Sequence, residues 1–344
     1  MKRKTIFLIC VCTVMAFLFT SCGKSAAKKD HISHQGNSNT NVSESEFSNA
    51  DASVVYFTAD ISAEGLIKIY EQLGWQPTGK VAVKISTGEP PASNYLRPEL
   101  IGDLVQQLHG TIVECNTAYG GSRSSSAMHK QVAEDHGFTA IAAFDLMDED
   151  GEMKLPVTVP DGMKQHLKED VVVSHFANYH DYLILSHFKG HAMAGFGGAI
   201  KNISIGIASP KGKRLIHTGS KSTSNIWGGN QTDFTESMAK AGKAVSDYLG
   251  NGERIVYINV MNRLSVDCDC DGNPAEPDIH DIGILASCDP VALDQACVDL
   301  VYNAEGNASL VRRIESKNGI HTLEHAEAIG LGSRSYHLVD IDKQ

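Results

Sequence analysis

Short β-rich apolar runs alternate with amphipathic helical stretches along most of this chain, and this alternation limits the fold more than any other feature. Alternation at this spacing is typical of βαβ units, in which neighbouring strands run parallel and helices cover the sheet. The predicted strands are 53–58, 80–85, 111–115, 139–144, 181–187, 254–260 and 281–287; the predicted helices are 63–73, 97–108, 127–136, 234–249 and 290–302. We therefore predict an α/β fold with a mainly parallel sheet and flanking helices.

A less regular stretch, 153–173, separates the elements into two sets. This division predicts a two-lobed molecule with a ligand cleft, formed by a single domain over residues 51–344. This prediction includes the case in which both lobes contribute strands to one sheet. In such folds ligands bind beyond the carboxyl ends of the strands, so the loops that follow each strand are the first places to look for chemistry.

The beginning of the chain has the pattern of an export signal. Its first residues are basic, an apolar run covers 5–19, and small residues lead into Cys22. This predicts a signal peptide over 1–21, lipid attachment at Cys22 and a lipid-anchored protein on the outer side of the cytoplasmic membrane, in the cell envelope. The alternative is a retained N-terminal anchor. Residues 22–50 are polar and poor in large apolar residues, which predicts a disordered tether.

Charge and cysteine usage exclude some classes of protein. The formal net charge is −11, and no run of Lys and Arg occurs in the body of the chain, so nucleic acid is not an expected partner. The cysteines that follow the signal and the lipid site are odd in number and crowd into the last quarter, unlike a disulfide framework. They are Cys115, Cys268, Cys270, Cys288 and Cys297.

The loop over 267–278 contains both members of a Cys-x-Cys pair. Separated by one residue, Cys268 and Cys270 look too close to bond to each other, which leaves metal ligation, with Asp269 as a further ligand, or a bridge to Cys288. The spacing of its aspartates also imitates a calcium loop of the EF-hand type, although two prolines and a strand-like approach argue against one. A turn rich in Asp and Gly is the third interpretation.

The densest group of chemically active residues follows the strand 181–187. Glycines allow the backbone to approach a ligand closely, neutral histidine is a common metal ligand, and a desolvated lysine can become a nucleophile. The candidate residues here are Lys189, His191, Gly195, Gly197, Gly198, Lys201, Asn202 and His217. A tight packing turn with exposed basic residues is the alternative.

Three motifs together resemble the bacterial family known as domain of unknown function 362, whose members are often labelled iron-sulfur centre proteins. The motifs are the stretch 189–217, Tyr-Gly-Gly-Ser-Arg at 119–123, and the segment from Cys268 to Ala296, which includes Asp294. The resemblance implies a metal centre, and it makes Asp294 a candidate contact to substrate or metal. The Cys-x-x-Cys runs of ferredoxins are absent, so a full cluster held by this chain alone is not expected.

The spacing of His191, Lys201 and His217 is similar to that of the nickel-pincer-nucleotide lactate racemases. That resemblance implies a nucleotide cofactor anchored on Lys201, nickel ligation by His217 and proton transfer by His191. It also assigns Arg97 and Arg123 to substrate binding. Ser122 stands where these racemases have a second proton-transferring histidine, and His129 could replace it only if the fold returned it to the site.

Two functions follow from these patterns. The first is a metal- or cofactor-binding lipoprotein that acts as an isomerase- or lyase-like enzyme on a small oxygenated substrate. The second is an iron-sulfur or other metal-centre protein that transfers electrons or binds metal without turnover. Because export through the general secretory route requires an unfolded chain, a divalent metal taken up after export is the simplest cofactor.

Overall fold

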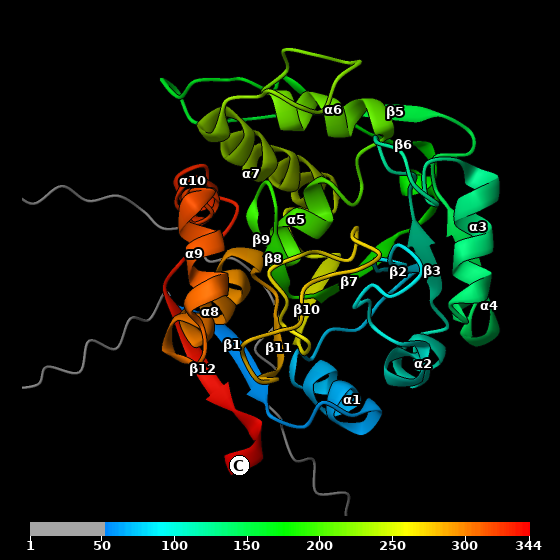
Figure 1. Cartoon of the computed structure of the whole chain (residues 1–344), viewed down its shortest axis with the longest axis vertical. Helices are drawn as coiled ribbons and strands as arrows, with labels where there is room; N and C mark the ends of the chain where they lie inside the picture. Colours follow the sequence, from blue (N-terminus) through cyan, green and yellow to red (C-terminus); the bar gives the residue numbers. More distant parts are fainter. Residues whose placement is uncertain (1–51) are drawn as a thin grey trace, which may run out of the picture.

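The computed structural model describes residues 52–344, and its centre is an eight-stranded sheet with helices on both faces (Figure 1). The strand order is β12-β1-β11-β10-β7-β2-β3-β4. The bounds are β1 Ser53–Thr58, β2 Val81–Lys84, β3 Thr111–Glu114, β4 Phe144–Leu146, β7 Asp181–His187, β10 Ile255–Met261, β11 Gly283–Ser287 and β12 Tyr336–Asp340.

Five neighbouring strands, from β10 to β4, run parallel. Strand β11 is antiparallel to both β10 and β1, and β12 pairs in parallel with β1 at the edge. The predicted α/β class with a mainly parallel sheet is therefore confirmed. The two sets of predicted elements contribute strands to the same sheet.

The central strand β7 is buried along its whole length, and its side chains alternate between two cores. Tyr182 and Ile184 belong to one core, whereas Leu183 and Leu185 belong to the other. This alternation is the period-2 geometry of a strand whose two faces are both covered. It explains why the sequence of β7 is almost continuously apolar.

Helices α1 and α2 pack against one face of the sheet, and α5 and α8 pack against the other, with α7 outside α5 (Figure 1). Local capping signals start several of them: Ser62 accepts a hydrogen bond from Gly65 at α1, and Asp289 accepts from Val291 and Ala292 at α8. The bounds are α1 Ala63–Gln72, α2 Pro98–Gln107, α3 Ser126–Asp135, α4 Phe138–Ile141, α5 Ala199–Ser204, α6 Pro210–Thr218, α7 Gln231–Tyr248, α8 Pro290–Asn303, α9 Ala308–Ser316 and α10 Ile320–Ala328.

Some predicted elements are wrong or missing. The predicted strand 139–144 is the short helix α4, and β4 begins only at Phe144; a short apolar run does not distinguish a helix from a strand. The predicted irregular stretch 153–173 contains most of a hairpin, formed by β5 (Glu152–Pro156) and β6 (Glu169–Val173). A second hairpin was not predicted, and it pairs β8 (Lys189–His191) with β9 (Gly195–Gly197).

The predicted signal peptide over 1–21, the tether over 22–50 and the lipid site at Cys22 lie outside the described residues. Within residues 52–344, no helix combines the length and the apolar character that crossing a bilayer requires.

Candidate functional site

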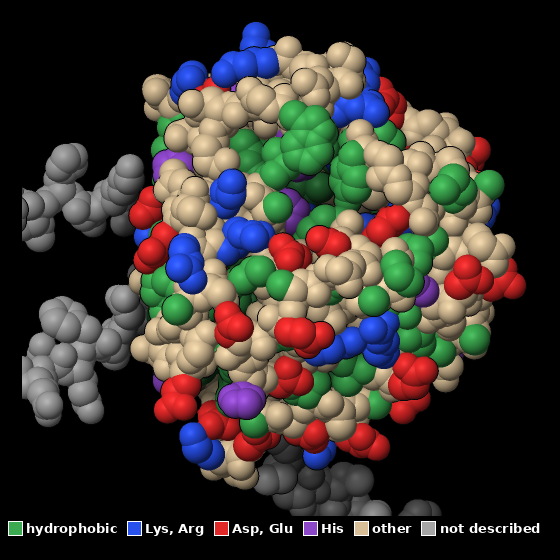
Figure 2. Space-filling view, viewed as in Figure 1, with side chains coloured by type: hydrophobic (Ala, Val, Ile, Leu, Met, Phe, Trp, Pro, Cys, Tyr) green, Lys and Arg blue, Asp and Glu red, His purple; other side chains and the backbone are tan. Residues whose placement is uncertain are grey.

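A pocket opens beyond the carboxyl ends of the parallel strands β2, β3 and β7. Each strand ends with a polar residue that lines this pocket: Lys84 on β2, Glu114 on β3 and His187 on β7. This is the edge where parallel α/β sheets bind ligands. The inner pocket has a cavity volume of about 120 Å³ and continues into an outer part of about 410 Å³. Figure 2 shows the hollow on this face, with histidine at its base and apolar side chains around its rim.

Lys84 and Glu114 form a buried ion pair at the base of the pocket. The Lys84 ammonium lies 2.8 Å from Glu114 Oε2 and 3.1 Å from Asn202 Oδ1, and the backbone N–H of Thr87 donates to the other carboxylate oxygen. Burial alone would raise the pKa of Glu114, but Lys84, His129 and Arg123 together lower it to about 2. Glu114 is therefore a fixed anion that is already matched by a cation.

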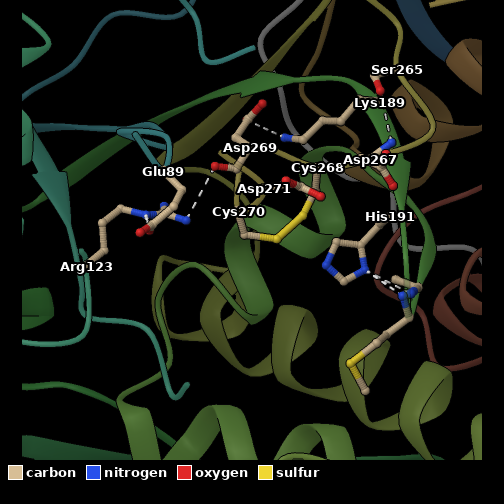
Figure 3. The surroundings of a disulfide bond; sticks show 12 residues. Glu89, Arg123, Lys189, His191, Ser265, Asp267, Cys268, Asp269, Cys270 and Asp271 are labelled. Atoms are coloured by element: carbon tan, nitrogen blue, oxygen red, sulfur yellow. Dashed lines mark hydrogen bonds and ion pairs between the residues drawn. A yellow bond between two sulfur atoms is a disulfide. The ribbon is translucent and has the colours of Figure 1, made fainter. Parts of the chain in front are cut away.

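Asp269 is a second buried anion, and it too is fully engaged. One of its oxygens lies 2.7 Å from His187 Nδ1. The other lies 2.8 Å from the Lys189 ammonium (Figure 3). His187 Nε2 lies 2.6 Å from the Asn262 carbonyl oxygen, so both ring nitrogens lie beside oxygen atoms. The predicted metal ligand Asp269 thus holds two basic side chains of the pocket wall.

The loop over residues 265–272, called here the Cys268 loop, lies directly against strand β8. The Gly190 N–H donates to the Ser265 carbonyl at 2.8 Å. A Cβ at Gly190 would come within 2.3 Å of the Val266 carbonyl oxygen, so only glycine permits this approach. The glycine brings the Cys268 loop over the pocket and beside His191.

Cys268 and Cys270 form a disulfide bond with each other, which corrects the interpretation that they are too close to bond. The chain turns at this point, with the Asp271 N–H donating to the Cys268 carbonyl at 2.9 Å. The turn places the two Cα atoms 5.2 Å apart, inside the range that disulfides require. In this state neither sulfur is available as a thiolate ligand.

A ring nitrogen of His191 and the sulfurs of Cys268 and Cys270 lie within 4.8 Å of one another, the single group of this kind found among residues 52–344. His191 Nδ1 accepts hydrogen bonds from the backbone N–H groups of Met193 and Ala194, at 3.2 and 3.0 Å. Burial, followed by the nearby cations, holds the pKa of His191 well below its usual value. His191 is therefore a neutral ring that carries its hydrogen on Nε2.

His217 on α6 has the opposite tautomer. Its Nδ1–H donates to the Lys213 carbonyl at 2.7 Å, and its ring stacks on Phe234. Burial is the main cause that lowers the pKa of His217 to about 3, with Lys201 and Lys213 acting in the same direction. The ring lines the pocket and retains an unprotonated Nε2, the form in which histidine ligates metals.

Lys201 on α5 lies in the pocket wall among other cations. Burial, and then the charge of Lys189, lowers its pKa to about 7, whereas Asp269 raises it. No hydrogen bond or ion pair involves its amine among residues 52–344, unlike the amines of Lys84 and Lys189. Among residues 52–344, Lys201 is thus the lysine of the pocket lining whose amine has no hydrogen-bond or ion-pair partner, since Lys84, Lys189 and Lys213 all have one.

Asp294 contributes to helix α5 and does not line the pocket. It accepts hydrogen bonds from the N–H groups of Ala199 and Ile200 at 2.8 and 3.0 Å, and from Asn259 Nδ2 at 2.8 Å. A Cβ at Gly198 would meet Asp294 Oδ1 at 2.3 Å, so this glycine makes room for the cap. The candidate substrate contact Asp294 is in the structure a buried helix cap.

Most of the remaining predicted residues line the pocket, and the others do not. Arg123 lines it, donating to Glu89 at 3.2 Å. Arg97 lies at the start of α2, stacked on Tyr95, outside the lining. The other predicted residues that line the pocket are Lys189, His191, Gly197, Gly198, Lys201, Asn202, His217, Cys268, Asp269 and Cys270, whereas Gly195 does not.

Neither Ser122 nor His129 belongs to the pocket lining. The Ser122 N–H donates to Glu89, and His129 is buried with Nε2 2.7 Å from the Thr87 hydroxyl. The fold therefore does not return His129 to the pocket as a second proton-transferring histidine.

Sequence reasoning missed Lys84, Glu114 and Cys115 as members of the site. All three line the pocket at the ends of β2 and β3, and the Lys213 ammonium lies 2.9 Å from the Cys115 sulfur. The available signal was their position at the ends of predicted parallel strands, since the ends of such strands meet at one edge of the sheet.

Comparison with known proteins gives one family and several distant structural likenesses, two of which are described below. The model of the family described as Domain of unknown function (DUF362) matches residues 81–299. No curated protein matches the chain. The lactate racemase apoprotein from Thermoanaerobacterium thermosaccharolyticum aligns at 14% identity over 72% of this chain and 56% of its own, with a TM-score of 0.40. A protein from Thermotoga maritima aligns at 12% identity over 78% of this chain and 58% of its own, with a TM-score of 0.39. The chain thus spans little more than half of either structure.

Proposed function

This chain belongs to the family described as Domain of unknown function (DUF362), and from that premise we propose that its pocket binds an anionic small molecule, as cofactor or substrate, through Lys201. The reaction class we assign is isomerase- or lyase-like, with His191 as the proton-transferring group. A divalent metal on His217 completes the proposed site. The ligand carries a carbonyl-type carbon that an amine can attack.

The observation that carries this proposal is the unbalanced charge of the pocket. Five cationic side chains line it but only two carboxylates, and both carboxylates are already paired. The cations are Lys84, Arg123, Lys189, Lys201 and Lys213. Excess positive charge in a pocket with few mobile counter-charges attracts and holds anions such as carboxylate or phosphate.

The lowered pKa of Lys201 supports a covalent role. An amine with a pKa of about 7 is half neutral at neutral pH, whereas an ordinary lysine is almost fully protonated. The neutral amine is the nucleophile that attacks a carbonyl carbon. Lys201 is therefore suited to form a bond to the ligand, which the resemblance to pincer racemases also implies.

His217 supplies a metal ligand beside that amine. Its Nδ1–H is fixed by the Lys213 carbonyl, which orients the ring and leaves Nε2 with a lone pair toward the pocket. These donors fit the nickel-pincer nucleotide that the resemblance implies, with Lys201 as attachment point and His217 as ligand. When bound, such a group would supply an electron sink for hydride or proton chemistry.

The outer pocket indicates that the ligand has an apolar or planar part. Met193, Ile226 and Trp227 line this region, and Trp227 is 60% exposed. A large aromatic side chain at the mouth of a basic pocket can stack on a planar ring of the ligand. The pocket thus accommodates a molecule with an anionic end inside and a planar end outside.

His191 favours proton transfer from one face of the substrate. Two backbone N–H groups occupy the lone pair of its Nδ1, so the neutral ring can take a proton only after it turns and presents its unprotonated nitrogen to the substrate, and no second histidine stands at the Ser122 position. A racemase needs an acid and a base on opposite faces of the carbon. An isomerase or lyase step, which one group can serve, therefore fits this chain better than lactate racemisation.

The test is elemental analysis and intact mass of the protein purified from its native compartment. We expect stoichiometric divalent metal and added mass on Lys201, both lost in Lys201→Met with an unchanged circular dichroism spectrum. Lys211→Met is the matched control, because Lys211 is an exposed lysine paired with Glu152. Metal without added mass would favour a metal-binding protein without turnover, and neither metal nor ligand would refute the proposal.

We also propose that the protein is a lipoprotein anchored through Cys22 in the cell envelope, from the signal pattern that precedes this residue. Metabolic labelling with a radioactive fatty acid should label the wild-type chain and not Cys22→Ala. Equal labelling of both chains would refute the assignment.

A further inference from the structure

The disulfide between Cys268 and Cys270 occupies the boundary between the inner and outer parts of the pocket. Both cysteines line both parts, so the bond faces the open mouth as well as the basic interior. Cys268 is 7% exposed, whereas Cys270 is only half-buried. Cys270 is therefore the more accessible of the two cysteines.

This bond closes a ring of three residues and is not what holds the Cys268 loop in place. Such a short ring constrains the unfolded chain less than a long-range bridge does, so its effect on stability is small. Other contacts fix the loop: Asp269 binds His187 and Lys189, and Arg313 donates to the Val266 carbonyl at 2.7 Å. The loop therefore keeps its position when the bond is opened.

His191 is the neighbour of the two sulfurs that can stabilise negative charge on them directly. The neutral His191 ring lies beside them, and its Nε2–H is the hydrogen available for donation, because Nδ1 accepts from two backbone N–H groups (Figure 3). The pocket wall also contains Lys189 and Lys201, and two of the aspartates beside the cysteines are paired with cations, Asp269 with Lys189 and Asp267 with Arg313. A hydrogen-bond donor and nearby cations stabilise a thiolate relative to a thiol.

We propose that Cys268 and Cys270 form a redox-active dithiol–disulfide pair that exchanges with an external dithiol at the mouth of the pocket. This site does not depend on the proposed ligand chemistry of Lys201. Because the pair lies over the pocket entrance, the redox state of the compartment would affect how readily a ligand enters the basic interior.

The exchange proceeds in two displacements. A thiolate of the external dithiol attacks the Cys270 sulfur, the bond between the cysteine sulfurs breaks, and its electron pair stays on Cys268 as a thiolate that His191 Nε2–H stabilises. The second thiol of the reductant then displaces the Cys270 sulfur. The external dithiol becomes a disulfide, the protein gains two electrons, and the two protons that the dithiol releases pass to the cysteines or to water.

The experiment equilibrates the full chain in buffers of reduced and oxidised dithiothreitol, traps thiols with a maleimide and locates them by peptide mass. We expect Cys268 and Cys270 to be reduced together and reversibly while the circular dichroism spectrum stays native. The buried thiols Cys115 and Cys297 should stay unlabelled. In His191→Phe the equilibrium constant for reduction should fall by roughly tenfold, the effect of losing a hydrogen bond to a charged group.

The matched control is His337→Phe, which changes an exposed histidine on β12, away from the pocket. Reduction that occurs only with loss of the native spectrum would overturn the proposal, because the bond would then be structural. A His191→Phe shift no larger than that of the control would also overturn it. His191→Leu is the second variant if the first does not fold, with the same expected shift.

Discussion

Replacement of Asp294 with asparagine should destabilise the fold by about 2 to 4 kcal/mol. The carboxylate accepts three hydrogen bonds, two at Oδ1 from Ala199 N–H and Asn259 Nδ2 and one at Oδ2 from Ile200 N–H. An asparagine oriented to keep its oxygen at Oδ1 turns its NH2 group toward the Ile200 N–H. One hydrogen bond to a charged group, worth about 1.5 to 3 kcal/mol, is then lost, and two buried donors, the Ile200 N–H and the new NH2 group, face each other without an acceptor.

The lower cost of burying a neutral amide offsets part of this loss, which sets the upper limit of the range. The assay is equilibrium unfolding in urea, in which the midpoint should fall at an unchanged m-value. Asp299→Asn is the control on the same helix, because Asp299 is less buried and, among residues 52–344, its carboxylate accepts only from the Gln295 and Tyr336 side chains. A loss below about 1 kcal/mol, or no larger than that of the control, would show that this carboxylate does not hold α5.

Three further predictions concern the pocket wall. The pKa of His217 falls to about 3 in the folded protein, so below pH 6.5 the unfolded chain binds a proton that the folded protein does not. The free energy of unfolding should therefore drop by about 1.4 kcal/mol per pH unit between pH 6 and 4, relative to His217→Asn. Urea unfolding at each pH measures this, and parallel profiles for the two proteins would contradict it. Glu114→Gln should lower the free energy of unfolding by about 3 to 5 kcal/mol, because Lys84 is left buried without its partner, and adding Lys84→Met should restore most of that stability. A double variant as unstable as the single one would contradict the ion-pair argument. Gly190→Ala should lower the free energy of unfolding by about 1 to 3 kcal/mol and speed proteolysis within the Cys268 loop, because the new Cβ would meet the Val266 carbonyl oxygen. Unchanged proteolysis would refute the close approach.

The sequence predicted those strands whose side chains are buried on both faces. The run 181–187 is apolar almost throughout because β7 lies between two cores, so composition alone marks it. Five helices of the described part of the chain were not predicted, namely α4, α5, α6, α9 and α10. Helix α5 has only six residues, and Asp294, almost a hundred positions later, provides its cap. Local patterns do not contain such a long-range contact.

The site was predictable where residues lie close together in sequence and unpredictable where strand pairing unites them. The histidines and lysines between 187 and 217 form one cluster along the chain, and most of them line the pocket. Lys84 and Glu114 look like ordinary surface charges until β2 pairs with β3 and places them side by side. The separation of Cys268 and Cys270 along the chain wrongly suggests that they are too close to bond, because it takes no account of the turn that brings the two sulfurs together.

The placement of β1 has a consequence for how this chain matures. Its partners in the sheet are β11 and β12, which are the last two strands that a ribosome produces. Ser53 binds Asp289, 236 positions later, and Thr58 binds Asp342, 284 positions later. The backbone N–H and C=O groups of β1 therefore have no partner strand until synthesis is almost finished. Contacts between residues so far apart in the sequence also form slowly. A nascent chain of this topology therefore stays incompletely folded until almost its whole length has been synthesised.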